Sequence, residues 1–275
     1  MRTRTNLPAG GFSDLDDAAG RDRGQFIVAL ARGLEVLRAF GPDDRMLGNL
    51  EIAGKTGLPK PTVSRITYTL AKLGYLEFVP RNAKYQLGAA VLTLGHAYRG
   101  ALGVRAVAHA PMQALADELD CQVALGSREG LTITYVDIVS GPGVRALRLD
   151  VGARLAIERS AAGRAFLAGL TSTERGLITD AIERRDPHGW PAIRDEIDKA
   201  AMEVTTHGFY VGLGLHEPGF NAVAATLSAE GAGGYAVVNV AGPATQFPAR
   251  RLYEEVGPRL REVVEAIGGA AAQND

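Results

Sequence analysis

The chain has 275 residues, of which 46% are hydrophobic and 22% are charged, a composition typical of a globular protein with room for two domains. No apolar run approaches the roughly 18 residues of a membrane span, and the first residues lack the apolar stretch of a signal peptide. The single cysteine, Cys121, excludes an intramolecular disulfide framework and a cysteine-rich zinc site. We therefore expect a cytoplasmic protein that does not bind membranes.

Charge is distributed unevenly along the chain. Residues 20–100 carry 12 Lys and Arg against 6 Asp and Glu, a net charge of +6, whereas residues 101–275 carry 16 against 22, a net charge of −6. A basic segment followed by an acidic one indicates a nucleic-acid-binding domain joined to a domain that does not touch the polyanion.

The N-terminal segment begins without periodicity. Residues 1–20 are rich in Gly, Ala and Asp, so we predict a disordered arm there. Residues 26–40 then predict a helix that ends at Gly41-Pro42 and packs beneath the helices that follow. The apolar positions expected to face inward are 26, 27, 30, 34, 37 and 40.

Residues 50–73 read as a helix-turn-helix. A first helix has Leu50 and Ala53 on one face with Ile52 beside them, and it stops at Gly57, a residue suited to a left-handed helix end. A second helix begins near Pro59, because proline is tolerated only in the first turn of a helix. The apolar stripe of this second helix, which should face inward, consists of Val63, Ile66, Leu70 and Leu73.

The remaining faces of the second helix are polar and basic. Hydroxyls and cations on the exposed N-terminal half of a helix suit the DNA major groove, where Arg and Lys read guanine edges and hydroxyls bond to bases or phosphates. The alternative is an ordinary amphipathic hairpin with a solvated polar face. The residues predicted to contact DNA are Lys60, Pro61, Thr62, Ser64, Arg65, Thr67 and Tyr68.

A β-hairpin follows this second helix directly. Residues 75–79 and 84–87 are strand-like and are joined by a Pro-Arg-Asn-Ala turn. A hairpin beside a recognition helix makes a winged helix-turn-helix, and this one can place Arg81, Asn82 and Lys84 on the phosphates that flank the groove. The context therefore favours DNA binding over the solvated hairpin.

Two helices are predicted after the wing, a linker helix at 90–102 and a further helix at 105–119. The apolar residues of the linker cover more than one face, which is more than a winged domain alone would bury. We therefore expect a homodimer joined through the winged domain and the linker helix, and a dimer of dimers through the C-terminal domain. The apolar linker residues are Val91, Leu92, Leu94, Ala97, Tyr98 and Leu102.

From Cys121 onward the pattern changes to strands and helices around one sheet. Strands are predicted at 121–127, 131–139, 144–150, 221–228 and 234–241. Helices are predicted at 160–170, 195–207 and 248–267, with a further helix capped by Thr171 or Ser172 that carries Glu174 in its first turn. This order indicates an α+β sensor-type domain.

Together these segments resemble the IclR family of bacterial transcriptional regulators over residues 24–268. The resemblance rests on the order and spacing of ALARGLEVLRAF, IAGKTGLPKPTVSRITYTLAKLGYLE, YQLGAAVLTLG, GARLAIERSAAGRAFLAGL and VNVAGPATQFPARRL. It implies an α+β protein with a winged helix-turn-helix that binds a palindromic operator as a dimer, and a GAF-like domain that binds a small organic acid. The domain bounds that follow are an arm at 1–20, a DNA-binding domain at 21–88, a linker helix at 89–103 and an effector domain at 104–270.

An acid site can also be read from the residues around Ser160, the predicted start of a helix. The small residues Ala161, Ala162 and Gly163 would carry the free backbone N–H groups of that helix, and its dipole favours an anion there. The alternative is that Ser160 only caps its own helix. The resemblance implies the acid site, with the ligand carboxylate on these N–H groups and further contacts from Leu147, Leu155, Gly212, Ala222, Asn239 and Ala241.

The chain departs from some of the family members whose pocket is known at several of these positions. Where they offer an acidic side chain, a thiol and two hydroxyls to a small keto acid, this sequence has Gly212, Ala222, Asn239 and Ala241. We expect a larger and more apolar pocket that suits an aromatic carboxylic acid better than glyoxylate or pyruvate and leaves Asn239 free to bond to a ring substituent. The neighbouring loop carries His216, Glu217 and Asn221. Two alternatives stay open for these residues, which either supply polar contacts to the pocket or lie on the surface.

No catalytic arrangement is evident in the sequence. The five histidines show no HExxH spacing, and neither a Gly-x-Ser-x-Gly turn nor a phosphate-binding glycine loop is present. We therefore expect no catalytic residue, no metal and no cofactor. The predicted function is a ligand-responsive transcriptional repressor or activator of a catabolic operon, with operator DNA and a small organic acid as partners. The alternatives are a winged-helix module for protein contacts and a small-molecule enzyme.

Overall fold

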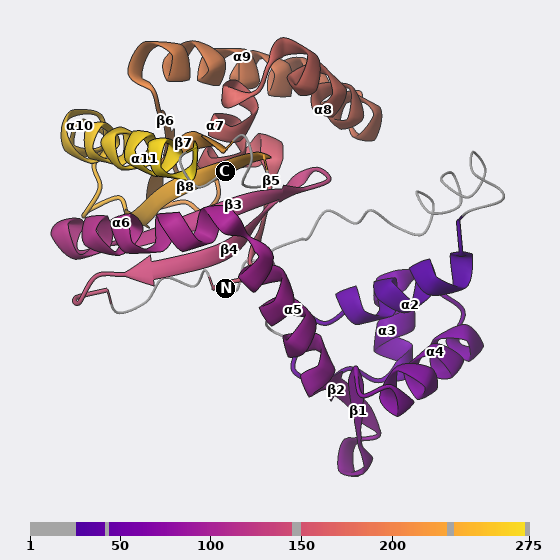
Figure 1. The fold of residues 1–275 in the computed structure, drawn as a ribbon. Helices are drawn as coiled ribbons and strands as arrows, with labels where there is room; N and C mark the ends of the chain where they lie inside the picture. The colour runs from indigo at the N-terminus through magenta and orange to yellow at the C-terminus, as the bar shows by residue number, and fades with distance from the viewer. Residues whose placement is uncertain (1–25, 42–43, 145–149, 230–233, 273–275) are drawn as a thin grey trace. The chain divides into compact units, whose positions relative to one another are not determined.

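The computed structural model describes residues 26–41, 44–144, 150–229 and 234–272 and divides into two compact units, Met1–Gly100 and Ala101–Asp275 (Figure 1). The arm predicted at 1–20 and most of the strand predicted at 144–150 lie outside the described residues. Among the described helices, none combines the length and the apolar character needed to cross a membrane.

The first unit is a winged helix-turn-helix. Its elements are α2 (Val28–Arg38), α3 (Asn49–Thr56), α4 (Lys60–Lys72), β1 (Leu76–Val79), η1 (Pro80–Asn82), β2 (Lys84–Leu87) and the linker helix α5 (Ala89–Ala101). β1 and β2 pair antiparallel, and a bridge between Leu47 and Tyr85 adds the segment before α3 to this hairpin. The predicted helices and wing are confirmed.

The turn between α3 and α4 forms for the reasons read from the sequence. Gly57 ends α3 in the left-handed conformation, with a φ of 69°, which glycine adopts without steric strain. Pro59 is the N-cap of α4 and Pro61 lies in its first turn, where the missing N–H removes no helical hydrogen bond. The helices pack over a core of Val36, Leu47, Ile52, Leu58, Val63 and Leu76.

The buried faces of α2 and α3 differ from the predicted ones. In α2 the buried residue is Val36, whereas Leu30 and Leu34 are exposed. In α3 the core residue is Ile52, and Leu50 is exposed. Each helix carries more apolar positions than one stripe can hold, and packing against the other helices decides which of them are buried. The inward packing expected of Leu30 and Leu34 was therefore wrong.

The second unit is built on a six-stranded antiparallel sheet with the order β5-β4-β3-β8-β7-β6. Its strands are β3 (Gln122–Glu129), β4 (Thr132–Ser140), β5 (Arg154–Ala156), β6 (Tyr210–Leu213), β7 (Phe220–Ala229) and β8 (Gly234–Pro243). The strands predicted within 121–139 and 221–241 are confirmed. The sequence does not predict β5 and β6, which are only three and four residues long and, unlike β1 and β2, are not joined to each other by a short turn.

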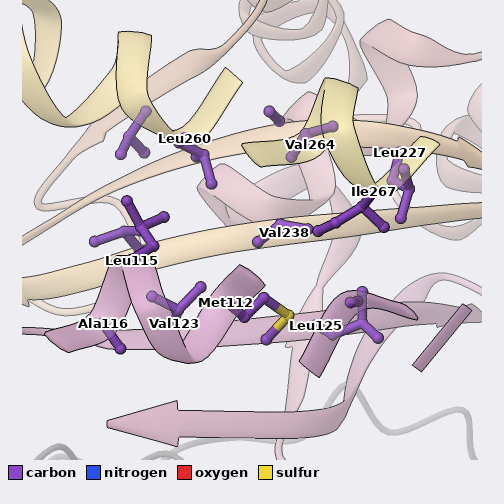
Figure 2. Close-up of a cluster of buried hydrophobic side chains, with 14 of the residues drawn as sticks. Met112, Leu115, Ala116, Val123, Leu125, Leu227, Val238, Leu260, Val264 and Ile267 are labelled. Carbon is purple, nitrogen blue, oxygen red and sulfur yellow. The ribbon is translucent and has the colours of Figure 1, made fainter. Parts of the chain in front are cut away.

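Helices cover both faces of this sheet. On one face lie α6 (Gly103–Leu119) and α11 (Gly257–Ala272), which bury Met112, Leu115, Val238 and Ile267 together (Figure 2). On the other face lie α7 (Ala161–Gly169), α8 (Ser172–Arg185) and α9 (Trp190–His207). The chain enters α11 through α10 (Ala249–Arg251) and a π turn, Leu252–Val256. The predicted two-domain α+β architecture is confirmed.

The starts of α8 and α9 follow local sequence signals. Thr171 caps α8 by accepting from the backbone N–H of Glu174 at 3.3 Å, and Glu174 accepts in return from the Thr171 N–H at 3.1 Å. This reciprocal pair is the predicted capping arrangement. α9 begins at Trp190, earlier than the predicted residue 195, with Pro191 in its first turn.

Candidate DNA-binding surface and effector site

The outer face of α4 carries most of the residues predicted to contact DNA. Lys60, Ser64, Arg65 and Tyr68 are exposed together with Pro61, and Thr62 is half-buried. Within the described parts of the chain, the side chains of Lys60 and Arg65 form no hydrogen bond or ion pair. Two cations without an intramolecular partner are therefore available to a polyanion.

Thr67 does not belong to this exposed face. Its side chain is fully buried, and its hydroxyl donates to the Asn49 side-chain oxygen at 3.1 Å. Thr67 follows the core residue Val63 by one helical turn, so it faces α3. The predicted DNA contact by Thr67 was wrong, because the polar character of a threonine does not reveal that its hydroxyl is satisfied internally. Leu73, predicted to face inward, is instead exposed.

The wing residues differ in their surroundings. The Lys84 ammonium donates to the Glu51 carboxylate of α3 at 2.8 Å, and this hydrogen bond is the main reason that the pKa of Glu51 lies below its ordinary value. Asn82 contacts the Met46 sulfur at 3.6 Å. Arg81 is exposed and has no polar side-chain partner within the described residues. Arg81 is therefore the wing cation most available to phosphate.

The start of α7 presents buried backbone donors. Ser160 is its N-cap, accepting from the Gly163 N–H at 3.1 Å and donating to the Ala156 carbonyl at 2.9 Å. Ala161 and Ala162 are only 5% and 1% exposed, and among the described residues no acceptor is recorded for their N–H groups. Capping by Ser160 uses only the N–H of Gly163, so it does not occupy the N–H groups of Ala161 and Ala162, which have no acceptor among the described residues.

A buried arginine fixes this helix start. The Arg164 guanidinium, one turn into α7, donates through Nε to the Glu158 carbonyl at 3.1 Å and through Nη1 to the Tyr210 hydroxyl at 2.8 Å and the Glu196 carboxylate at 3.0 Å. The Glu158 carboxylate in turn accepts from Arg185 at 2.7 Å. These contacts tie α7 to β6, α8 and α9.

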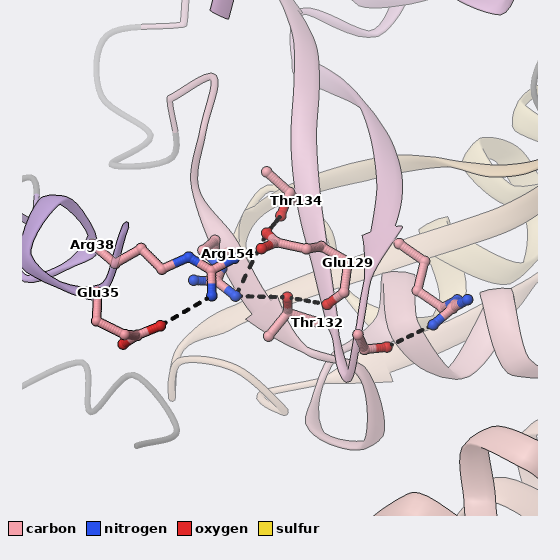
Figure 3. A network of polar contacts seen from close by, with 8 residues as sticks. Glu35, Arg38, Glu129, Thr132, Thr134 and Arg154 are labelled. Carbon is pink, nitrogen blue, oxygen red and sulfur yellow. Dashed lines mark hydrogen bonds and ion pairs between the residues drawn. The ribbon is translucent and has the colours of Figure 1, made fainter. Parts of the chain in front are cut away.

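Strand β5, which leads into α7, is held to the β3–β4 hairpin by polar contacts (Figure 3). Arg154 approaches the Thr132 hydroxyl at 3.4 Å and the Glu129 carboxylate at 3.5 Å. The same carboxylate accepts from Thr134 at 3.4 Å. The approach to the α7 start is therefore fixed by side chains as well as by strand pairing.

The sheet beneath α7 carries the other predicted effector residues. Gly212, Ala222 and Ala241 are paired across β6, β7 and β8 and so share one face. Leu155 is buried on β5. Leu147 lies outside the described residues. The structure therefore brings Gly212, Ala222 and Ala241 together and places them on the sheet face that α7 covers.

Two expectations about this face require correction. A Cβ atom at position 212 would lie 2.9 Å from the Ala161 Cβ and 2.8 Å from a Leu215 methyl carbon, so Gly212 allows close packing and does not add free volume. The amide of Asn239 is not wholly free, because its Nδ2 donates to the Tyr135 hydroxyl at 2.9 Å. The sequence pattern of β4 marks Tyr135 only as a strand residue, so its place beside Asn239 was missed.

The loop that carries His216 and Glu217 is held in place by hydrogen bonds of Asn221. Asn221 is buried; its amide donates to the Phe247 carbonyl at 2.8 Å and its oxygen accepts from the Gly214 N–H at 3.1 Å. Asn221 therefore holds the loop in place, and His216 and Glu217 are exposed. In the described part of the chain, no group of three or more His, Cys, Asp or Glu side chains could hold a metal ion.

A winged helix-turn-helix joined in one chain to an α+β domain with an antiparallel sheet defines a two-domain transcriptional regulator. The chain belongs to the IclR family. Residues 29–80 match the IclR helix-turn-helix domain, and residues 96–268 match the bacterial transcriptional regulator IclR C-terminal domain.

Similar proteins support the same assignment. The chain is 32% identical over 243 residues to the HTH-type transcriptional regulator TsaQ1/TsaQ2 of Comamonas testosteroni, covering 88% of this chain and 87% of the relative. An IclR family transcriptional regulator from Brucella abortus has a similar solved structure, with a TM-score of 0.79, 43% identity and coverage of 92% of this chain and 95% of that one. An IclR homolog from Microbacterium hydrocarbonoxydans, solved in complex with 4-hydroxybenzoate, has a TM-score of 0.67 and 23% identity, covering 89% and 99% of the two chains. The protein is a transcriptional regulator and not an enzyme.

Proposed function

We propose that this regulator binds a palindromic operator as a homodimer and responds to an aromatic carboxylic acid held at the start of α7, in control of a catabolic operon. The observation that carries the effector site is the pair of buried N–H groups of Ala161 and Ala162, for which no acceptor is recorded among the described residues. Buried donors at a helix start favour a carboxylate, since hydrogen bonds and the helix dipole both stabilise negative charge there.

An aromatic ring in the ligand is supported by the small apolar side chains on the sheet face that α7 covers. Ala222 and Ala241 lie side by side in register, and Leu155 is buried on β5. Ala222 and Ala241 supply neither a carboxylate, a thiol nor a hydroxyl, which a small keto acid would need to satisfy its own polar atoms. The 4-hydroxybenzoate complex of the Microbacterium homolog indicates that the fold can accommodate an aromatic acid.

DNA recognition is assigned to the outer face of α4 and to the wing. Lys60 and Arg65 on the helix and Arg81 on the wing are cations without a side-chain partner among the described residues, and Ser64 and Tyr68 supply exposed hydroxyls on the helix. Pro61, Thr62 and Asn82 flank these groups at the same surface. This set combines base-reading and phosphate-binding side chains, as operator recognition requires.

Dimerisation is supported by the linker helix α5. None of its residues is buried, and Leu92 and Tyr98 are 76% and 51% exposed. Leu94 is exposed as well. A helix with this many exposed apolar side chains is stabilised by a partner helix, and a two-fold axis through it would present two recognition helices to half-sites about one helical turn apart.

The test is a titration of the full-length protein on operator DNA identified by footprinting, with and without a panel of benzoate-type acids, glyoxylate and pyruvate. We expect a dimer on a palindromic site, binding that weakens as salt rises, and a response to the aromatic acids alone. A response to pyruvate or glyoxylate in preference to aromatic acids would contradict the effector assignment. A monomer by sedimentation that protects a single half-site would contradict the dimer.

A further inference from the structure

A buried phenol and a buried amide meet on the sheet face that α7 covers. Tyr135 of β4 and Asn239 of β8 are 1% and 4% exposed, and the Asn239 Nδ2 donates to the Tyr135 hydroxyl oxygen at 2.9 Å. The two residues come from strands that do not pair with each other, since β3 lies between them. The β3 residues opposite them are Gly126, paired with Tyr135, and Ala124, paired with Asn239, so only small residues separate the two.

This pair has unused hydrogen-bonding capacity. Burial raises the pKa of Tyr135, so its phenol is neutral and keeps its proton. That proton has no recorded acceptor in the described part of the chain, and the Asn239 Oδ1 has no recorded donor there. A tyrosine hydroxyl can donate one hydrogen bond, and an amide oxygen can accept two. The pair therefore offers one donor and one acceptor from two side chains that are almost entirely buried.

The pair lies on the same side of the sheet as the unpaired N–H groups of α7, at some distance from them. Asn239 pairs with Ala224 on one side and Ala124 on the other, and both alanines belong to the core beneath α7. Gly212, which lies against Ala161, is on β6, two strands away from Asn239 on β8. Along the strand direction the two positions differ by two residues, so both lie on the same face of the sheet. The spacing between strands and the rise per residue place the Cα atoms of Gly212 and Asn239 about 12 Å apart.

We propose that Tyr135 and Asn239 form a subsite that recognises a hydroxyl group on the effector, at the end opposite the carboxylate. The inference rests on the proposed function, because it takes the α7 start as the carboxylate site. A hydroxyl is the small substituent that both accepts a hydrogen bond, here from the Tyr135 O–H, and donates one, here to the Asn239 Oδ1. The effector class that follows is a rigid aromatic acid with a hydroxyl group para to the carboxylate, since that position points away from the carboxylate along the ring axis.

A methyl group of similar volume would fit the same space but satisfy neither residue. The tyrosine proton and the amide oxygen would then be cut off from water without a partner. The subsite should therefore discriminate by hydrogen bonding and not by size, and discrimination should depend on both side chains.

The experiment is calorimetry on the full-length protein with benzoate, 4-methylbenzoate and 4-hydroxybenzoate, using the wild type, Tyr135→Phe and Asn239→Leu. We expect the wild type to bind 4-hydroxybenzoate about 10-fold or more tightly than 4-methylbenzoate, the ratio expected from one or two buried hydrogen bonds. Each variant should bring this ratio close to 1 while leaving benzoate affinity nearly unchanged. Tyr253→Phe, which removes a phenol hydroxyl that contacts Glu203, is the matched control and should keep the wild-type ratio.

The outcomes separate this inference from the proposed function. Binding of all three acids without preference, or a preference that survives in both variants, would overturn the hydroxyl subsite and leave the aromatic-acid function intact. Binding of none of the acids to folded wild-type protein would overturn the aromatic-acid function and the subsite together. Because the readout is a ratio between ligands on one protein, a loss of stability in a variant does not imitate either result.

Discussion

The Lys84 ammonium of the wing donates to the Glu51 carboxylate of α3 at 2.8 Å, so the wing is tied to the first helix of the helix-turn-helix. The charge of Lys84 is partly neutralised there, whereas Arg81 has no such partner within the described residues. We predict that Arg81→Met reduces the salt slope of operator binding by about 0.9, as expected for one phosphate contact, and that Lys84→Met changes it less. Fluorescence anisotropy over a range of salt concentrations measures both slopes, and an equal reduction would show that Lys84 leaves Glu51 to bind phosphate.

The same ion pair predicts a dependence of stability on pH. The pKa of Glu51 lies below 4.5 in the folded chain, first because of the Lys84 hydrogen bond and second because of the Gly48 N–H. The folded state therefore binds fewer protons than the unfolded state, and the stabilisation is present above pH 4.5 and is lost as the pH falls through the lowered folded value. Thermal melts of wild type and Glu51→Gln should differ at pH 7 and converge in acid. A difference that is constant with pH would contradict this assignment.

Arg65 and Lys60 should contribute to DNA binding in different ways. If Arg65 reads a base edge, Arg65→Ala costs roughly 1–3 kcal/mol and relaxes one operator position. Lys60 at the start of α4 is placed for a phosphate, so Lys60→Ala should weaken all sequences alike. A library of single-base operator variants measures both effects, with exposed Arg194→Ala in α9 of the other unit as the control. Equal losses at every position for Arg65→Ala and Lys60→Ala would contradict the distinction.

Gly163 is required by the close approach of the chain to the α7 start. A Cβ atom there would lie 2.0 Å from the Ile157 carbonyl oxygen, a backbone atom that cannot move aside cheaply. We expect Gly163→Ala to destabilise the protein by about 1–3 kcal/mol or more. Gly176 in α8 is the matched control, since a Cβ there meets nothing within 4 Å. Gly176→Ala should stabilise the protein by about 0.5–1 kcal/mol through helix propensity. Denaturant unfolding of both variants tests the contrast, and similar effects would contradict it.

The sequence predicted the order of the elements well because local signals determine it. Gly57, Pro59 and the Thr171 capping arrangement act within one helical turn, and each is confirmed. Which face of a helix is buried depends on partners that are distant in sequence. Thr67 is therefore buried against Asn49, whereas Leu50 is exposed.

The candidate effector site could be predicted only where it is local. The cap of Ser160 and the small residues after it are contiguous, so the helix start and its backbone donors could be read from the chain itself. The contact between Tyr135 and Asn239 spans 104 residues and depends on the strand order β4-β3-β8. No periodicity reports which strands become neighbours, so neither the phenol nor its hydrogen bond to the amide could be predicted.

The last prediction concerns the volume available to the ring of the effector. Ala222 is only partly buried on β7 and lies between Gly212 and Ala241 in the sheet. We expect the ring of Ala222→Phe to occupy the sheet face where the proposed effector ring would lie and to reduce affinity for benzoate-type acids about 10-fold or more, in line with the cost of overpacking. Operator binding should be unchanged, because α4 and the wing belong to the other unit. Ala114→Phe, at an exposed position of α6 on the opposite sheet face, is the control and should bind the acids normally.

The ligand can be varied in the same experiment. A carboxylate on the N–H groups of Ala161 and Ala162 makes charge-assisted hydrogen bonds, which are roughly twice as strong as neutral ones. Replacing the carboxylate of 4-hydroxybenzoate by a carboxamide should therefore weaken binding to the wild type more than removing its ring hydroxyl does. Calorimetry with the acid, the amide and benzoate on wild type, Ala222→Phe and Ala114→Phe gives the full comparison. If Ala222→Phe binds the acid as well as the wild type does, the ring lies elsewhere; if the amide binds as well as the acid, the α7 start does not hold the carboxylate.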